Sequence, residues 1–130
     1  MIVVDTSALL AVILDEPKAA ACVIALQAAQ DLAMSAGTLQ EAMIVASCKD
    51  LDGELAELID RAAISIVEVT AASARNAAAA YRLWGKGFHA AALNYGDCFA
   101  YALAKELNCP LLFIGNDFSR TDIVSALGQS

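Results

Sequence analysis

The sequence predicts an α/β fold in which a mostly parallel sheet is covered by helices. Short apolar segments rich in β-branched residues alternate along the chain with longer segments of helical character. Strands that are separated by helices in this way form parallel sheets. The 130 residues suit one domain, and neither a repeat nor a Gly/Ser-rich linker divides them. We therefore expect residues 1–130 to form a single α/β domain.

The first half of the chain contains two predicted strands and four predicted helices. Ile2–Val4 is short and β-branched, which is typical of a buried strand. Residues 5–7 then offer three capping side chains before the apolar run 8–14. Pro17 can open a second helix that runs to about residue 30. The remaining expected elements are a strand over 32–35 and helices over 38–48 and 53–62.

The second half adds two strands and two helices. The segment Ile64–Val69 is the clearest strand in the sequence. Thr70 is placed to cap an alanine-rich helix that runs to about Trp84, where a Gly-Lys-Gly sequence breaks it. The remaining expected elements are a loop to residue 95, a helix over 98–107 and a strand over 111–114.

Composition argues against a membrane protein and against a disulfide scaffold. Apolar residues make up 59% of the chain, but alanine supplies much of this fraction. The longest stretch without a formal charge, 19–30, is shorter than the roughly 20 residues of a spanning helix. No positive region precedes the first apolar run, so we expect a cytoplasmic protein without a signal peptide. The four cysteines lack CxxC spacing, which favours buried, reduced thiols over a zinc site.

The net charge of −7 restricts how the chain could bind nucleic acid. Proteins that rely on broad phosphate contacts are usually basic. An acidic chain binds nucleic acid through a local basic patch, through a metal ion, or not at all. An acidic surface also suits a basic protein partner.

Three aspartates stand where a ligand of an α/β sheet is expected. Asp5 ends the first strand, Asp117 comes shortly after the last strand, and Asp97 opens a helix. Ligands of open α/β sheets bind beyond the carboxyl ends of the strands. Each residue also has a simpler interpretation, as a helix cap for Asp5 and Asp97 and as a turn residue for Asp117.

Glu41, in the third predicted helix, is the fourth candidate. It shares a helix face with Ile44 and Val45, and we expect those apolar residues to point inward. On that orientation Glu41 is buried too, which is costly for a carboxylate without a partner. The nearest basic residue that follows, Lys49, is two turns away. The alternative is a rotated helix with Glu41 in solvent.

Convergence of the four carboxylates would require a cation or partial protonation. Two unit charges about 5 Å apart repel by roughly 3 kcal/mol at an effective dielectric constant near 20. A cluster of such groups takes up protons or binds a positive ion. Oxygen ligands without histidine or cysteine suit Mg²⁺ or Mn²⁺ rather than zinc. An ion of this kind lowers the pKa of bound water and contacts phosphate oxygens, which offsets the adverse net charge.

One notable basic run precedes Asp97. It comprises Arg75, Arg82, Lys86 and His89. Arg75 and Arg82 share a helix face, which is either a phosphate-steering patch or a solvated surface. His89, the sole histidine, is expected to be structural or substrate-positioning. Trp84 and Phe88 are able to stack on bases, although Trp84 at a helix end also suits the core or an interface.

Three segments of the chain resemble PIN-domain toxins of the VapC type. They are Met1–Leu10, then Gly85–His89 leading into Leu93–Cys98, and finally Leu111–Phe118 with Thr121–Ile123 behind it. Each motif alone has modest specificity. Together, in this order and spacing, they extend the resemblance over nearly the whole chain.

The resemblance implies a three-layer α/β/α PIN-like fold and an Mg²⁺- or Mn²⁺-dependent endoribonuclease. It implies that the catalytic and metal-binding residues are Asp5, Glu41, Asp97 and Asp117. Relatives usually carry two aspartates where this chain has Asn116-Asp117, so we assign the fourth role to Asp117, acting through a second ion or a bound water. It also implies an RNA substrate, a cognate antitoxin that holds the toxin inactive, and a homodimer.

In the mechanism implied by the resemblance, Asp5 and Asp97 ligate the ion directly. Glu41 completes the ligand shell or accepts a proton from the attacking water. Thr6 or Ser7 either hydrogen-bonds a ligand carboxylate or serves as a helix cap.

Other functional classes fit the sequence less well. A phosphatase with an aspartate nucleophile needs an Asp-x-Asp pair, but Ser7 stands two residues after Asp5. A receiver-type phosphoacceptor needs a lysine after a late strand, but Gly115-Asn116-Asp117 follows the last strand here. A dinucleotide binder needs a glycine fingerprint after the first strand, and this sequence has none there. The alternative that stays open is a catalytically weakened PIN-like module that binds a protein partner, because Asn116 replaces an expected carboxylate.

Overall fold

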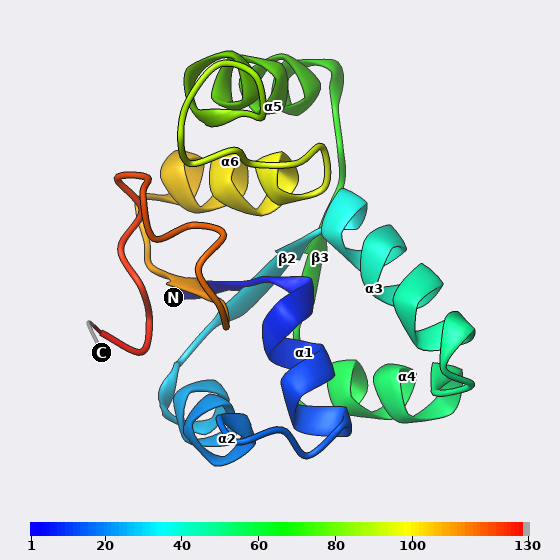
Figure 1. Cartoon of the computed structure of the whole chain (residues 1–130). Coiled ribbons are helices and arrows are strands. Elements are labelled where there is room, and N and C mark those ends of the chain that lie inside the picture. The colour runs from blue at the N-terminus through cyan, green and yellow to red at the C-terminus, as the bar shows by residue number, and fades with distance from the viewer. Residues whose placement is uncertain (129–130) are drawn as a thin grey trace.

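A four-stranded parallel sheet forms the centre of the molecule (Figure 1). The computed structural model describes residues 1–128. Every pairing between neighbouring strands is parallel, which confirms the predicted sheet. The strands pair in the order β3-β2-β1-β4 and are β1 (Ile2–Val4), β2 (Leu32–Ser35), β3 (Ser65–Val67) and β4 (Leu111–Leu112).

Helices cover both faces of the sheet, which gives the expected three-layer α/β/α arrangement. In Figure 1, the helices above the sheet are α5 (Ala71–Trp84) and α6 (Asp97–Leu107). Those below it are α1 (Thr6–Ile13), α2 (Ala19–Ala28) and α4 (Asp52–Arg61), with α3 (Ala36–Cys48) at the side. Within residues 1–128, no helix combines the length and apolar character needed to cross a bilayer.

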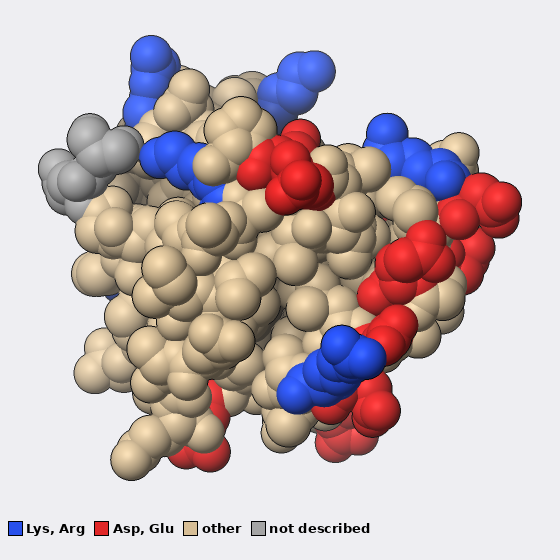
Figure 2. Space-filling view, turned by 90° about the horizontal axis from the view of Figure 1, so that it is seen from below, with Lys and Arg blue, Asp and Glu red and all other residues tan. Residues whose placement is uncertain are grey.

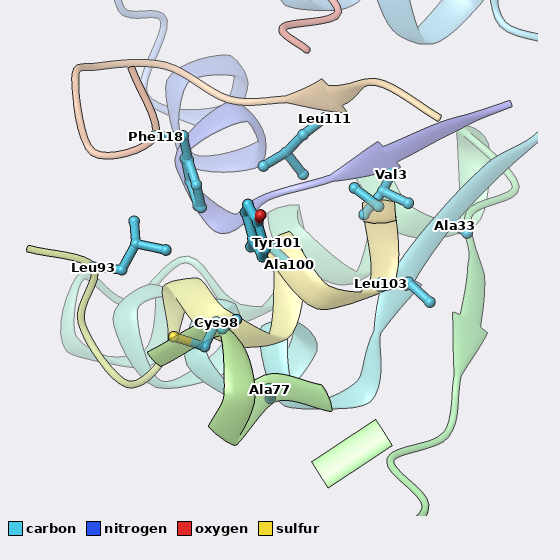
Figure 3. Close-up of a cluster of buried hydrophobic side chains, with 12 residues drawn as sticks. Val3, Ala33, Ala77, Leu93, Cys98, Ala100, Tyr101, Leu103, Leu111 and Phe118 are labelled. Carbon is cyan, nitrogen blue, oxygen red and sulfur yellow. The ribbon is translucent and has the colours of Figure 1, made fainter. Parts of the chain in front are cut away.

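The strand residues alternate between two apolar cores. Val3 points toward α5 and α6, whereas its neighbour Val4 packs against α1 and α2 on the other face. Figure 3 shows the first of these cores, in which Phe118 from the C-terminal segment lies beside Tyr101 of α6. Alanines such as Ala77 let α5 approach α6 closely. The alanine-rich composition therefore serves helix packing.

Two strands are shorter than the sequence predicts. The strand expected over 111–114 ends at Leu112, because β1 has already ended at Val4 and offers no further backbone partner. The amide of Ile114 instead bonds the side chain of Ser7. The strand expected over 64–69 is limited to residues 65–67, because it lies at the sheet edge and pairs only with β2.

The prediction that all four cysteines are buried is wrong for one of them. Cys22 and Cys98 are buried and Cys109 is half-buried, but Cys48 is exposed. Cys48 is the last residue of α3, where the helix has passed beyond the core.

Candidate active site

The carboxylate of Asp5 is held where β1 passes into α1. Its Oδ2 caps α1 by accepting hydrogen bonds from the Ser7 amide at 3.1 Å and the Ser7 hydroxyl at 2.7 Å. The Ser7 Oγ also accepts from the Ile114 amide at 3.0 Å, which links α1 to the chain after β4. Asp5 therefore caps α1, as predicted, and Ser7 hydrogen-bonds the carboxylate of this candidate ligand, which was also predicted.

The second oxygen of Asp5 has no partner. Asp5 is only 5% exposed, and its Oδ1 is buried without a hydrogen bond. Burial, with a smaller contribution from the charge of Glu41, raises the pKa of Asp5 to about 6 despite the bonds from Ser7. A buried, unpaired carboxylate oxygen is costly, and a bound cation is one way to satisfy it.

Glu41 reaches the same region from α3. Thr6 Oγ1 donates a 2.8 Å hydrogen bond to Glu41 Oε1, so Thr6 supports a candidate ligand as expected. The predicted inward orientation of Ile44 is wrong, because Ile44 is 57% exposed and α3 buries Ala42 and Ala46 instead. Glu41 is consequently only half-buried and lies between α1 and the start of α6.

Asp97 stands in the first turn of α6 and is held by Asn94. The Asp97 amide donates to Asn94 Oδ1 at 2.8 Å, and the Asn94 amide donates to Asp97 Oδ2 at 3.0 Å. This reciprocal exchange is the pattern of a capping box. It fixes the carboxylate of a residue that is only 5% exposed.

Gly96 allows Glu41 and Asp97 to approach each other. A Cβ atom at Gly96 would lie 2.9 Å from the Glu41 Cδ and closer still to its Oε2. The carboxylate of Glu41 thus rests against the residue that precedes Asp97. In Figure 1 the first turns of α1, α3 and α6 gather at the carboxyl edge of the sheet.

Asp117 approaches this edge from the loop after β4. Its side chain is exposed, and its charge contributes to the raised pKa of Asp97. The loop is tied at one end by the bond from Ile114 to Ser7. At the other end, Asp122 accepts hydrogen bonds from Tyr101 and, at 3.0 Å, from Lys105 of α6.

Asn116 contributes its backbone to the same loop. Its carbonyl accepts hydrogen bonds from the Ser119 amide at 3.1 Å and the Ser119 hydroxyl at 2.7 Å. Its side chain is exposed. The hydrogen bonds of Asn116 are therefore those of a turn residue, and they involve its backbone carbonyl and not its side-chain amide.

The electrostatics of Asp97 connect all four candidates. Burial is the main cause that raises the pKa of Asp97 to about 7, and the nearby charges of Asp5, Asp117 and Glu41 raise it further. Asp5, Asp117 and Glu41 thus lie near enough to Asp97 for their charges to act on it. Like charges nearby disfavour the ionised form, so Asp5 and Asp97 are both less easily ionised than free aspartate.

The oxygen-rich donor set fits a small divalent ion that retains water ligands. Within residues 1–128, no three histidine, cysteine, aspartate or glutamate side chains are grouped so that they alone could hold a metal ion. Mg²⁺ is usually bound through one or two carboxylates and keeps several waters. The unpaired Oδ1 of Asp5 and the raised pKa of Asp97 agree with such a site.

The basic and aromatic residues before Asp97 divide into two groups. The three cationic side chains are exposed: Arg75, Arg82 and Lys86. This exposure agrees equally with a phosphate-steering patch and with a solvated surface. His89 is structural in its contacts: its ring packs edge-on against Trp84 at 4.7 Å and its Nδ1 accepts from a backbone amide. Trp84 donates its indole N–H to the Tyr101 hydroxyl at 2.8 Å and so belongs to the core, not to a base-stacking surface.

Comparison with known proteins decides the family. Residues 2–124 match the PIN domain. The chain belongs to the PIN domain family. The PIN domain spans both the acidic edge and the C-terminal loop that carries Asp117, so the four candidates lie within it.

Relatives of this PIN domain include mycobacterial proteins named as ribonucleases. The chain is 47% identical over 126 residues to VapC ribonuclease Mb0640 of Mycobacterium bovis, covering 95% of this chain and 96% of that protein. Ribonuclease VapC30 of Mycobacterium tuberculosis matches with the same identity and coverage. Ribonuclease VapC of Mycolicibacterium smegmatis is 44% identical, over 95% of this chain and 98% of the relative.

Solved structures show that the PIN fold is shared at much lower identity. VapC20 of Mycobacterium tuberculosis, described as a Sarcin-Ricin loop cleaving toxin, superposes with a TM-score of 0.77 at 15% identity. That match covers 95% of this chain and 97% of the other. A chain of a toxin-antitoxin complex from Klebsiella pneumoniae superposes with a TM-score of 0.73 at 18% identity, covering 97% and 98%.

Two residues that support the site were not recognised from the sequence. The Asn94-x-x-Asp97 spacing is a capping-box signal, and it could have indicated how Asp97 is held. The role of Gly96 had no sequence signal, because the contact comes from Glu41, which is far away in the chain.

Proposed function

We propose that this PIN domain is an endoribonuclease and the toxin of a toxin–antitoxin pair. The names of its relatives at 44–47% identity support a ribonuclease. The observation that carries the site is the buried, unpaired Oδ1 of Asp5, together with the buried Asp97, whose charge is influenced by Asp5, Asp117 and Glu41. We assign catalysis to these four residues.

Asp5 and Asp97 are the residues that would hold a divalent ion, Mg²⁺ or Mn²⁺. Asp5 offers its unpaired Oδ1. The charges of Asp5, Asp117 and Glu41 oppose the ionisation of Asp97, and a bound cation would relieve this repulsion. When bound, the ion lowers the pKa of a water ligand and neutralises charge on a phosphate oxygen. Ser7 and Asn94 hold the two carboxylates in place for this purpose.

We assign the role of proton acceptor to Glu41. Thr6 fixes its Oε1, which leaves Oε2 directed toward Gly96 at the edge of the cluster. In hydrolysis, the attacking water gives its proton to Glu41 as its oxygen bonds to phosphorus. The P–O bond opposite breaks, and the leaving oxygen takes up a proton from solvent to become a hydroxyl. Asp117, on the exposed side, would help to hold the ion through a bound water.

We further propose that a basic antitoxin covers part of the acidic surface. Figure 2 shows a broad area without charged side chains on the face seen from below Figure 1, with several acidic and fewer basic side chains along one margin. A groove of about 390 Å³ lies between α3 and α4, with Met43 and Leu55 in its wall and Asp52 and Asp60 beside them. Apolar surface bordered by acidic groups suits an amphipathic, basic segment.

A homodimer and a cytoplasmic location complete the proposal. Ile44 on α3 and Ile66 on the edge strand are large and exposed, and they offer apolar surface for a second copy. The free thiols suit a reducing compartment in which RNA is present. Light scattering measures the mass of the purified protein in solution and so tests for the homodimer.

Cleavage of a structured RNA by single carboxylate variants tests the assignment. With Mg²⁺ present, Asp5→Asn and Asp97→Asn should each lose activity by about 100-fold or more, as expected for loss of a metal ligand. Asp31→Asn is the control, because Asp31 is exposed and precedes β2 at the opposite edge of the sheet. Undiminished activity in both ligand variants would end the assignment.

A titration with Mn²⁺ separates the enzyme from the alternative of a weakened PIN-like interaction module. An active site of the proposed kind binds Mn²⁺ measurably by calorimetry, and Asp97→Asn abolishes the binding. An interaction module with a degenerate site would show no heat of binding in the unsubstituted protein.

A further inference from the structure

An exposed aromatic residue stands beside the acidic cluster. Tyr95 is 78% exposed, although it lies two residues before the buried Asp97. The proposed hydrolysis does not use it. A single exposed aromatic side chain is common on protein surfaces, but Tyr95 is set apart by its place next to Gly96, against which the Glu41 carboxylate rests.

The backbone of Tyr95 is held rigidly. Asn94 and Asp97 exchange two hydrogen bonds across it, at 2.8 and 3.0 Å. The Tyr95 ring also packs edge-on against Phe99, with ring centroids 5.4 Å apart and an interplanar angle of 84°. An aromatic ring fixed in this way loses little further entropy when a ligand packs on it.

Phe99 ties this aromatic pair to the same helix that carries Glu41. The ring of Phe99 lies so close to Gly37 that a Cβ atom there would be 2.6 Å from its Cγ. Glu41 follows one helical turn later on α3, and its carboxylate rests against Gly96, the neighbour of Tyr95. Tyr95 therefore stands at the rim of the cluster, between α3 and α6.

We propose that Tyr95 is a stacking platform for a nucleobase of the RNA, next to the phosphodiester bond that is cleaved. The inference rests on the proposed function of the acidic cluster. With a net charge of −7, the chain cannot rely on broad phosphate contacts. Stacking of a base on an aromatic ring does not depend on charge, and it acts on any base that is splayed out of a helix.

A thermodynamic cycle between the ring and the base tests the platform. The substrates are a short RNA that the protein cleaves and versions of it with an abasic nucleotide on either side of the scissile bond. For the unsubstituted protein, one abasic position should lower kcat/KM by roughly 5- to 150-fold, which corresponds to loss of one stacked base. Tyr95→Ala should lower kcat/KM for the intact RNA by a similar factor, mainly through KM. On the RNA that lacks the stacked base, Tyr95→Ala should cause no further loss of kcat/KM.

Three variants control the measurement. Tyr95→Phe keeps the aromatic face and should stay within about 2-fold of the unsubstituted protein, whereas Tyr95→Leu should behave as Tyr95→Ala. Leu83→Ala removes another side chain that is 58% exposed, on α5, and should change neither parameter. Because Tyr95 is exposed, thermal unfolding should be unchanged in all of them.

Two outcomes would overturn the platform. If Tyr95→Ala lowers the activity on intact and abasic RNA equally, the ring does not stack on a base. If Tyr95→Ala leaves cleavage unchanged but alters the mass of the protein in solution, Tyr95 belongs to a protein interface. Loss of cleavage in Asp97→Asn, measured alongside, shows that the active site itself stands in either case.

Discussion

The hydroxyl of Thr6 donates a 2.8 Å hydrogen bond to the carboxylate of Glu41, 35 residues further along the chain. This bond fixes the position of α3 relative to the first turn of α1. We expect Thr6→Val, which keeps the shape and removes the donor, to lower kcat about 10-fold or more. The cost in unfolding free energy should be about 1 kcal/mol, measured by urea denaturation. Thr6→Ser, which retains the hydroxyl, should restore most of the activity, and equal loss in both variants would contradict the role of the bond.

Gly96 offers a way to displace Glu41 without unfolding the protein. A methyl group at this position meets the end of a flexible side chain, and the backbone of Gly96 is helical, so alanine fits it without strain. Gly96→Ala should therefore reduce cleavage by about 10-fold or more and change thermal stability little. Gly53→Ala is the matched control, since no atom lies within 4 Å of the added carbon. That variant should retain full activity and gain up to about 1 kcal/mol of stability.

Removal of metal should make the stability of the protein fall as the pH rises. Burial raises the pKa of Asp5 to about 6 and that of Asp97 to about 7, above the ordinary value of 3.8. The unfolded chain releases these protons first, so the two groups favour unfolding increasingly as the pH rises from about 4 to about 7. In a chelator, the thermal midpoint should drop by several degrees between about pH 5 and about pH 8.

Two further measurements check the origin of that pH dependence. Asp97→Asn removes one of the buried charges, so it should flatten the pH profile and raise the midpoint at high pH. Saturating Mg²⁺ should raise the midpoint of the unsubstituted protein more at high pH than at low pH. A midpoint that is constant or rises with pH in the chelator would contradict the assignment.

The pair Asn116-Asp117 should contribute unequally to metal binding. Asp117 lies close enough to influence Asp97, whereas the described contacts of Asn116 are those of its backbone in a turn. Asp117→Asn should weaken Mn²⁺ binding about 10-fold by calorimetry, as loss of a supporting carboxylate does. Asn116→Ala should leave the affinity within about 2-fold, and a larger effect of Asn116→Ala than of Asp117→Asn would reverse our assignment.

The order and type of the elements could be predicted from the sequence because their signals are local. The β-branched run Ile2–Val4, the capping residue Thr70 and the glycines after Trp84 act on their immediate neighbours. The fold class followed from the alternation of these segments. Strand ends were less well predicted, since the partner strand decides them, as β1 does for β4.

The candidate carboxylates were recognisable as well, but their surroundings were not. Asp5, Asp97 and Asp117 stood at positions where parallel strands place ligands. The orientation of Glu41 was derived from Ile44, which proved exposed, because packing against α1 and α6 sets the rotation of α3. A hydrophobic pattern along one helix does not contain that information when its apolar residues surround it.

The sequence by itself determined an acidic α/β domain, the places of its helices and strands, and the carboxylates at the ends of its strands. Only the tertiary structure decided which oxygens are held and which is left unpaired: Ser7 binds one oxygen of Asp5 and leaves the other buried without a partner. Likewise it placed Tyr95 at the rim of the cluster. The physical reason is that local backbone preferences act over a few residues. Burial and charge repulsion depend instead on groups that the fold brings together from distant parts of the chain.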